Sequence, residues 1–250
     1  MHSTLTRPVA ALALMHAFLP ALAGPPLSID DPGILNRLQL EVITATTMTS
    51  TSTGKYYQVP LVDISLGIIK DHVQVAMVYP HAHAAPDNGR SEWDFGNLEV
   101  GVKWRFLNSG RLQMALAPYY VFGVKRGSAA TGIGNNTDVM VFPVNAEYQI
   151  NDMWRLNGEL RYSSIEAGDD EWDYGAAVAY ALDERWEYLF ELSGTTDSDF
   201  DSDFLVARAG VDAAVTESLH LLFSIATGLR EPSGQDELNY DLFFGFQFLH

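Results

Sequence analysis

Residue-by-residue alternation of apolar and polar side chains constrains this chain more than any other feature. In residues 154–162, one set of alternate positions holds Trp, Leu, Gly, Leu and Tyr, and the other holds Arg, Asn, Glu and Arg. A helix would scatter these charges over every face, whereas a strand places the two sets on opposite faces. Residues 98–106 and 238–248 alternate in the same way. The sequence therefore predicts strands with one apolar face each.

About twelve segments fit this description, with turn signals between them. They are residues 37–47, 57–67, 72–80, 93–106, 111–124, 137–150, 154–164, 172–182, 186–195, 204–215, 219–228 and 238–248. Their connections alternate in length. Tight turns are expected at 108–110, 151–152, 183–184 and 216–217, and longer polar loops at 81–92, 125–136, 165–171, 196–203 and 229–237. Short turns at one end and long loops at the other are typical of bacterial outer-membrane barrels, with the short turns in the periplasm.

Composition excludes several other classes of protein. No segment after residue 23 approaches 18 consecutive apolar residues, so a spanning helix is not expected there. The absence of cysteine excludes disulfide scaffolds, thiolate zinc sites and a cysteine nucleophile. A net charge of −17 argues against binding nucleic acid through its phosphates. Two classes remain, namely a membrane barrel and an exported soluble β-sandwich or lipocalin-like barrel.

The aromatic residues favour the membrane barrel. Indole and phenol rings prefer the headgroup zone of a bilayer, whereas a soluble core would place large aromatics in mid-strand. All five tryptophans fall at predicted strand ends, which makes them candidate membrane-interface residues: Trp93, Trp104, Trp154, Trp172 and Trp186. Strands of ~9–11 residues also match a tilted membrane crossing. The predicted fold is therefore all-β, a transmembrane antiparallel up-and-down β-barrel of the outer-membrane type over residues 37–250.

Three prolines depart from this pattern. Pro60, Pro118 and Pro143 lie inside predicted strands, where each removes a backbone donor from the hydrogen-bond ladder. A closed barrel has no edge strand to accommodate them. We expect bulges at these positions or strand boundaries that lie elsewhere.

The N-terminal segment has the features of an export signal. One cation, Arg7, precedes an apolar stretch that ends at Ala21-Leu22-Ala23, which fits the small-x-small cleavage rule. An uncleaved membrane anchor is the alternative, but the apolar stretch is short for a span. We expect residues 1–23 to be a cleaved signal peptide and residues 24–36 to be a periplasmic leader that occludes the barrel mouth. The expected location is the bacterial outer membrane.

Two stretches resemble a known family. Residues 24–32 read GPPLSIDDP, and residues 96–106 read GNLEVGVKWRF, followed by LAP at 116–118. They resemble the outer-membrane family labelled "putative MetA-pathway of phenol degradation", including its strand of the type G-x-x-E-x-G-x-K-x-R-F. The resemblance implies a transporter-like barrel linked by name to aromatic compounds. The alternating apolar residues from Tyr240 to Phe248 also resemble the C-terminal signal read by the barrel-assembly machinery.

If the apolar faces point to lipid, the opposite faces line the lumen. These candidate lumen residues are Arg37, Gln39, Glu41, Glu99, Lys103, Arg105, Arg111, Glu147, Arg155, Asn157, Glu159, Arg161, Asp173, Glu187, Glu191, Arg208, Asp212 and Asp241. Cations and anions are nearly balanced among them, which is atypical of a strongly ion-selective pore. Two interpretations stay open: a network of structural salt bridges in a narrow barrel, and a polar path for a small solute.

Metal and catalytic sites have little support in the sequence. The best metal candidates are Asp197, Asp199, Asp201 and Asp203, but they fail the EF-hand spacing, so no metal or other cofactor is expected. His81 and His83 fall in a predicted loop without a third ligand. His220 and Ser224 share a strand face, yet four residues of strand span ~13 Å, too far for a hydrogen bond. We do not expect an enzyme.

The leading functional hypothesis is a passive outer-membrane channel for small, aromatic or hydrophobic solutes. The alternative is a closed-lumen structural or surface-interaction barrel that presents acidic loops without transport. The expected partners are outer-membrane lipids and lipopolysaccharide, the barrel-assembly machinery and a small-molecule solute, with no nucleic acid.

Overall fold

The protein is an antiparallel β-barrel in a computed structural model that describes residues 24–250 except 125, 167, 201–202 and 233–235. The expected signal peptide lies outside the described residues. The strands are β1 (Leu40–Thr51), β2 (Gly54–Ile69), β3 (Val73–Pro86), β4 (Glu92–Phe95), β5 (Leu98–Ser109), β6 (Leu112–Leu116), β7 (Tyr119–Phe122), β8 (Val139–Gln149), β9 (Trp154–Ile165), β10 (Glu171–Ala181), β11 (Trp186–Asp197), β12 (Asp203–Thr216), β13 (Leu219–Arg230) and β14 (Leu238–Leu249). One short helix, α1 (Arg126–Ala130), lies between β7 and β8.

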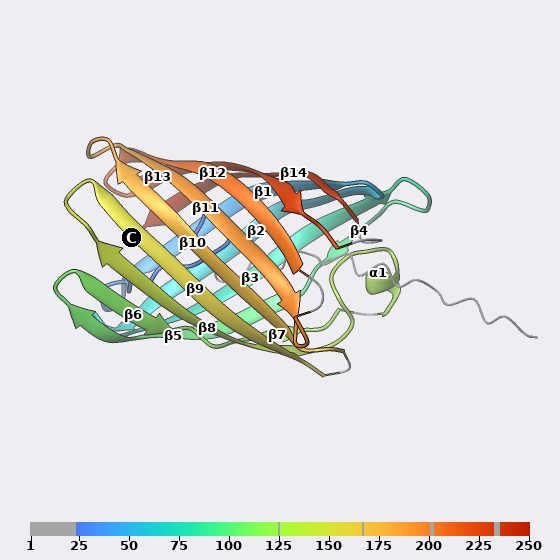
Figure 1. Ribbon diagram of the computed structural model, residues 1–250, viewed down its shortest axis with the longest axis horizontal. Coiled ribbons are helices and arrows are strands. Elements are labelled where there is room, and N and C mark those ends of the chain that lie inside the picture. Colours follow the sequence, from blue (N-terminus) through green and yellow to red (C-terminus); the bar gives the residue numbers. More distant parts are fainter. Residues whose placement is uncertain (1–23, 125, 167, 201–202, 233–235) are drawn as a thin grey trace, which may run out of the picture.

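The barrel is closed by pairing of its first and last strands. β1 pairs with β14 from Glu41↔Leu249 to Thr51↔Leu238. β4 and β5 both pair with β3, and β6 and β7 both pair with β5 and β8, so each of these pairs is one interrupted strand of the wall. The wall therefore has twelve strands, and the predicted fold class and strand number are confirmed. Figure 1 shows the longer loops and α1 at one end and the C-terminus at the other.

The boundaries of the first three strands were wrong. β1 begins at Leu40, and only Ser52 and Thr53 separate β1 from β2, so the Ser- and Thr-rich stretch read as a loop is strand. Threonine is β-branched and suits a pleated surface. Thr49 Oγ1 also donates to Asp241 Oδ1 on β14 at 2.7 Å. Polar hydroxyl residues thus continue the strand where apolar alternation ends.

Arg37 and Arg111 lie outside the strands in which they were expected. Both are exposed turn residues. The φ of Leu38 is 63° and Gln39 N donates to Asn36 O at 2.9 Å, so a tight turn precedes β1. The φ of Gly110 is 59°, a left-handed conformation that glycine adopts without steric cost, and it forms the turn that contains Arg111. The expectation that these two cations line the lumen is corrected.

The three prolines are accommodated in different ways. The pairing register of β2 shifts beside Pro60 on both of its neighbours, as expected for a bulge. Pro118 lies in the interruption between β6 and β7. At Pro143 the expectation of a bulge was wrong, because β8 pairs with β9 without a register shift. The Pro143 carbonyl accepts from Ala117 N at 3.0 Å, so the side of Pro143 that lacks a donor faces the interruption in the neighbouring strand.

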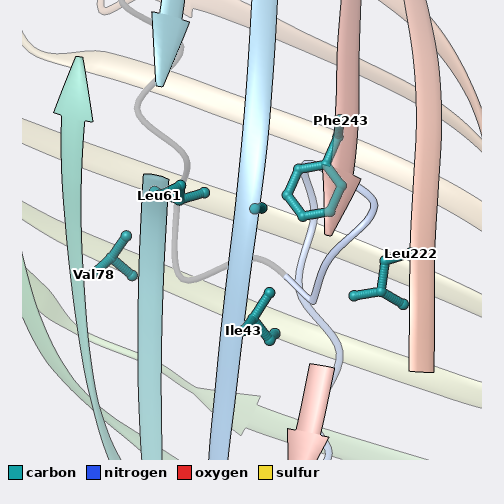
Figure 2. Close-up of a cluster of buried hydrophobic side chains, with 6 residues drawn as sticks. Ile43, Leu61, Val78, Leu222 and Phe243 are labelled. Atoms are coloured by element: carbon teal, nitrogen blue, oxygen red, sulfur yellow. The ribbon is translucent and has the colours of Figure 1, made fainter. Parts of the chain in front are cut away.

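The two faces of the wall have opposite character. Large apolar side chains cover the outside, with Phe190 57% and Leu192 53% exposed. The inside carries many polar residues, and the described residues also form four buried apolar clusters there, of which the one with most members consists of Ile43, Ala45, Leu61, Val78, Leu222 and Phe243. Figure 2 shows its side chains gathered from neighbouring strands. Phe243 is an apolar residue on the inward face of the last strand, and its ring lies over Gly245, where a side chain would collide with it.

The long connection between β7 and β8 packs into the barrel at the loop end. Ile133 is fully buried against Tyr56, Ala82 and Ala84 on the inner wall. Asn135 N donates to Asn97 Oδ1 at 2.9 Å, in the gap between β4 and β5. This connection therefore narrows the loop-end mouth. Within the described ranges, no helix has the length and apolarity needed to cross a membrane.

Candidate functional site: the lumen and its leader

Most of residues 24–36 lies inside the barrel, although Gly33 and Asn36 are exposed. Pro26 and Pro32 are fully buried, and Ile29 and Asp30 are also buried. Ser224 Oγ, in the middle of β13, donates to Pro26 O at 2.7 Å. The leader, as we name residues 24–36, therefore reaches the middle height of the wall.

Two glutamates hold the backbone of the leader. The Glu191 carboxylate accepts from Ser28 N at 2.8 Å and from Ile29 N at 3.1 Å. The Glu159 carboxylate accepts from Asp30 N at 3.0 Å. Buried backbone N–H groups are costly when they lack an acceptor, and hydrogen bonds to a charged acceptor are stronger than neutral ones. These carboxylates thus replace the partners that a strand or water would supply.

A lysine fixes the leader from the opposite side. Lys103 Nζ on β5 donates to Asp31 O at 2.9 Å and lies 2.6 Å from Asp30 Oδ2. Leu35 N donates to Gln74 Oε1 on β3 at 3.0 Å. Contacts from β3, β5, β9, β11 and β13 therefore hold the leader across the width of the lumen.

Small residues on the inner wall make room for the leader. A side chain at Gly175 on β10 would collide with Ile29 Cγ2. A Cβ at Gly210 on β12 would lie 3.1 Å from Pro26 Cγ, closer than side chains normally approach. The leader thus packs directly against the wall as well as bonding to it.

Each arginine of β9 and β12 bridges two carboxylates. Arg155 lies 3.4 Å from Glu147 Oε2 and 2.8 Å from Glu187 Oε2. Arg208 lies 2.8 Å from Asp241 Oδ2 and 3.8 Å from Glu191 Oε1.

Arg161, which contacts the leader, also bridges two carboxylates. Arg161 pairs with Glu159 and lies 3.9 Å from Asp173 Oδ2, and its Nη2 donates to Ser28 O at 3.2 Å. The two glutamates that bind leader amides are therefore themselves paired with arginines.

The remaining lumen candidates differ in their partners. Arg105 Nε donates to Asp71 O at 3.0 Å in the β2–β3 turn. Glu99 is 1% exposed, and its Oε2 has no hydrogen-bond partner among the described residues. Without Arg37 and Arg111, the anions among the candidates clearly outnumber the cations, so the expectation of near balance was wrong.

Asp63 was missed. It points inward from β2, between Leu61 and Ser65, and is 9% exposed. The signal was available in the sequence, because Val62, Ile64 and Leu66 on the opposite face are apolar.

A cavity of ≈ 400 Å³ lies between the leader and the wall. Its wall residues include Gln39, Glu41, Asp63, Gln74, Lys103, Arg155, Asn157, Glu187, Asp212 and Gln247, and its leader residues include Gly24, Ile29, Asp30, Asp31 and Leu35. Glu41, Arg155, Glu187 and Gln247 all lie near the short-turn ends of their strands. The cavity is therefore in the short-turn half of the lumen.

The histidines expected in a loop lie on β3. His81 and His83 both stack on Trp93, with their ring centroids 5.2 and 4.5 Å from that of Trp93 and interplanar angles of 19°. Ala82 and Ala84 alternate with them on the buried face, which is why the strand continues here. The loop assignment of these residues is corrected.

Four of the five tryptophans lie near the ends of their strands, whereas Trp104 lies in mid-strand because β5 extends to Ser109. Trp154 and Trp186 begin β9 and β11, and Trp172 and Trp93 are the second residues of β10 and β4. All but Trp172 are exposed large side chains.

The acidic stretch after β11 forms no metal cluster in the part of the chain that is described. Asp203 accepts from Tyr174 Oη at 2.5 Å and pairs with Arg230, and Asp201 lies outside the described residues. His220 Nδ1 lies 2.7 Å from Asp212 Oδ1, while Ser224 Oγ bonds to Pro26 O. The two members of the Ser/His pair thus have different partners.

Two carboxylates at the loop end have lowered pKa values. Asp138 accepts from Tyr120 Oη at 2.6 Å and from Gly123 N at 2.8 Å, and these bonds lower its pKa. Asp170 accepts from Tyr162 Oη and from Ile165 N, with the same effect. Both hydrogen-bond pairs tie a loop to the end of a strand.

Solved structures share this fold at low sequence identity. An outer membrane channel from Pseudomonas putida F1 is 12% identical, with a TM-score of 0.67 over 88% of this chain and 98% of its own. The KdgM porin is 7% identical, with a TM-score of 0.59 over 82% and 98%. The CymD monoaromatic hydrocarbon channel is 8% identical, with a TM-score of 0.52 over 86% and 89%.

A match in sequence identifies the family. No curated protein matches the chain. Residues 39–236, most of the described barrel, match the family model described as "Putative MetA-pathway of phenol degradation". The matched range includes residues 96–106, in agreement with their resemblance to the family, while residues 24–32 lie outside it; the chain belongs to this family of outer-membrane-type barrels.

Proposed function

We propose that this protein is a passive channel of the bacterial outer membrane for small solutes. The observation that carries the proposal is a closed barrel with an apolar outside and a polar lumen, in which a cavity of ≈ 400 Å³ remains beside the leader. A twelve-stranded wall is intermediate between filled eight-stranded barrels and open porins with 16–18 strands. The leader and the packed loop between β7 and β8 narrow this lumen further, so a narrow pore is expected.

The solutes we propose are small aromatic or hydrophobic molecules. The family description names phenol degradation, and a structural neighbour is titled a monoaromatic hydrocarbon channel. The apolar cluster around Ile43 and Phe243 supplies an apolar surface within the lumen. Liposomes that contain the folded barrel should swell faster than empty liposomes in phenol and in a size-matched sugar alcohol. Folded barrels without flux of either solute would refute transport.

A second candidate is a closed structural barrel. It is favoured by the leader, which crosses the lumen, and by the ion pairs that fill the wall around Arg161 and Arg208. In that case, the acidic loops would be the functional surface. Absence of solute flux together with a fully protected leader in limited proteolysis would support this candidate.

The outer-membrane location also implies processing and partners. We propose that residues 1–23 are cleaved before assembly, that the aromatic strand β14 is read by the barrel-assembly machinery, and that lipopolysaccharide contacts the loop end. Mass spectrometry of the purified membrane protein should give a mature chain that starts near Gly24. A chain that retains residues 1–23 would refute cleavage. We propose no catalytic step.

A further inference from the structure

The cavity beside the leader is lined mainly by acidic groups. Its titratable side chains are Asp30, Asp31, Glu41, Asp63, Glu187 and Asp212 as acids and Lys103 and Arg155 as cations. Gly24 also lines the cavity, so the proposed cleavage would add one α-ammonium group beside Asp30 and Asp31. Three of the acids have a basic partner. Lys103 pairs with Asp30, Arg155 with Glu187, and His220 with Asp212. Asp31, Glu41 and Asp63 have no cationic side chain in salt-bridge range among the described residues.

Asp63 is the strongest sign that something binds here. It is 9% exposed, and its Oδ1 atom has no hydrogen-bond partner in the described part of the chain. Asn157 Oδ1, on the opposite wall of the cavity, also lacks a partner. A buried acceptor without a donor is costly unless water or a ligand completes it. Both groups are acceptors, so a donor or a positive charge would satisfy them.

The lining also restricts the kind of cation. No group of three potential metal ligands occurs within the residues that are described, which disfavours a chelated metal ion. The cavity volume of ≈ 400 Å³ lies within the ~300–1,000 Å³ usual for small organic ligands. Ile43, Ala76 and Leu189 supply apolar walls next to the carboxylates. Carboxylates beside apolar surface suit an ammonium group that carries alkyl substituents.

We propose that this cavity binds small organic cations of the alkylammonium class, with Asp63 and Glu41 as the main charge partners. This assignment deepens the proposed channel function by naming a class of solute for the short-turn half of the lumen. The cation occupies the space next to the leader, in the cavity that Glu41, Asp63 and Asn157 help to line.

The first test measures binding without requiring transport. Saturation-transfer NMR on the folded barrel in detergent micelles, with tetramethylammonium and acetate as probes, should give a saturable signal for the cation only. Asp63→Asn should weaken tetramethylammonium binding about tenfold, as expected for loss of a charge ~5 Å away in a partly solvated site. Asp152→Asn makes the same change in the exposed β8–β9 turn and should have no effect. Equal binding by the wild type and Asp63→Asn would overturn the proposal.

Folding and transport are controlled separately. Each variant must show the wild-type difference in gel mobility between heated and unheated samples. If Asp63→Asn fails this check, Glu41→Gln replaces it, with the same expected direction. A bilayer under a KCl gradient should give a reversal potential with the sign for K⁺ preference, which falls towards zero in the variant. Binding without conductance would refute the channel and keep the site, whereas conductance without cation binding would refute the site.

Discussion

The two halves of the inner wall differ in how their charges are paired. On β9 to β13, the carboxylates of Glu159 and Glu191 each pair with an arginine and also accept leader amides. On β1 and β2, Glu41 and Asp63 lie beside an apolar cluster and have no cationic partner among the described residues. The first half therefore holds the leader through paired carboxylates, whereas the second half carries carboxylates of the cation site that we propose. The two halves differ in whether their carboxylates are paired with arginines, rather than in how many charges they carry.

The largest effect is expected from removal of a leader acceptor on the paired half. Glu191→Ala leaves the Ser28 and Ile29 amides without their acceptor and removes one partner of Arg208. Such a loss typically costs ~2–5 kcal/mol, enough to release the leader. We expect several-fold faster protease cleavage within residues 24–36. Glu184→Ala, in an exposed turn, is the control, and equal protection of the leader in both variants would contradict this role.

A smaller effect is expected from crowding the leader. Gly175→Ala places a methyl group against Ile29 and should weaken leader docking by ~1–3 kcal/mol. Gly158→Ala on the neighbouring strand meets nothing closer than 3.7 Å, so it makes the same change of residue without the collision. The double variant Gly175→Ala with Ile29→Ala should recover protection of the leader. If Gly158→Ala loosens the leader as much as Gly175→Ala, the packing argument is wrong.

Removing one carboxylate charge from each half tests whether the two halves have different roles. Asp63→Asn removes a buried unpaired charge and touches no leader contact, so it should leave leader protection unchanged and should not lower heat stability. Glu191→Gln retains an acceptor but removes the charge that faces Arg208, so it should loosen the leader less than Glu191→Ala. Urea unfolding and proteolysis of both variants in parallel measure this. A leader released by Asp63→Asn would show that the halves are not distinct.

The smallest effect concerns the loop end. The lowered pKa of Asp138 means that its hydrogen bonds stabilise the folded loop above the unfolded carboxyl pKa of ~4, and that this contribution is lost as pH falls through the lower folded value. Exchange of the Gly123 amide should therefore quicken, relative to its intrinsic rate, below about pH 4. Asp138→Asn should remove this pH dependence. If the Asp138→Asn variant keeps the pH dependence of amide exchange, a group other than Asp138 causes it.

The alternation of apolar and polar residues was enough to predict the strands of the wall, because each strand has one apolar and one polar face. This alternation predicted the number of strands and most of the residues that face the lumen. It failed at Arg37 and Arg111, since one or two turn residues with left-handed backbone decide where a strand begins. It gave Phe243 the correct inward side but not its contacts, because the ring packs over Gly245 and against residues of other strands.

The leader could be located only in part. Its position before the first strand suggested the barrel mouth, but its depth depends on acceptors that lie far apart in the sequence, such as Glu159, Glu191 and Gln74. The same holds for the pairing of each carboxylate, because register across neighbouring strands decides which arginine it meets. These long-range relations determine which lumen charges remain unpaired.

Single-channel conductance with and without the leader tests the central claim most directly. The full mature chain and a chain that lacks residues 24–36 are compared in planar bilayers, after both show heat-modifiable gel mobility. We predict a small conductance for the full chain and a several-fold larger one for the truncated chain, because the lumen is that of a twelve-stranded barrel narrowed by the leader. Equal conductance of the two chains would contradict this account.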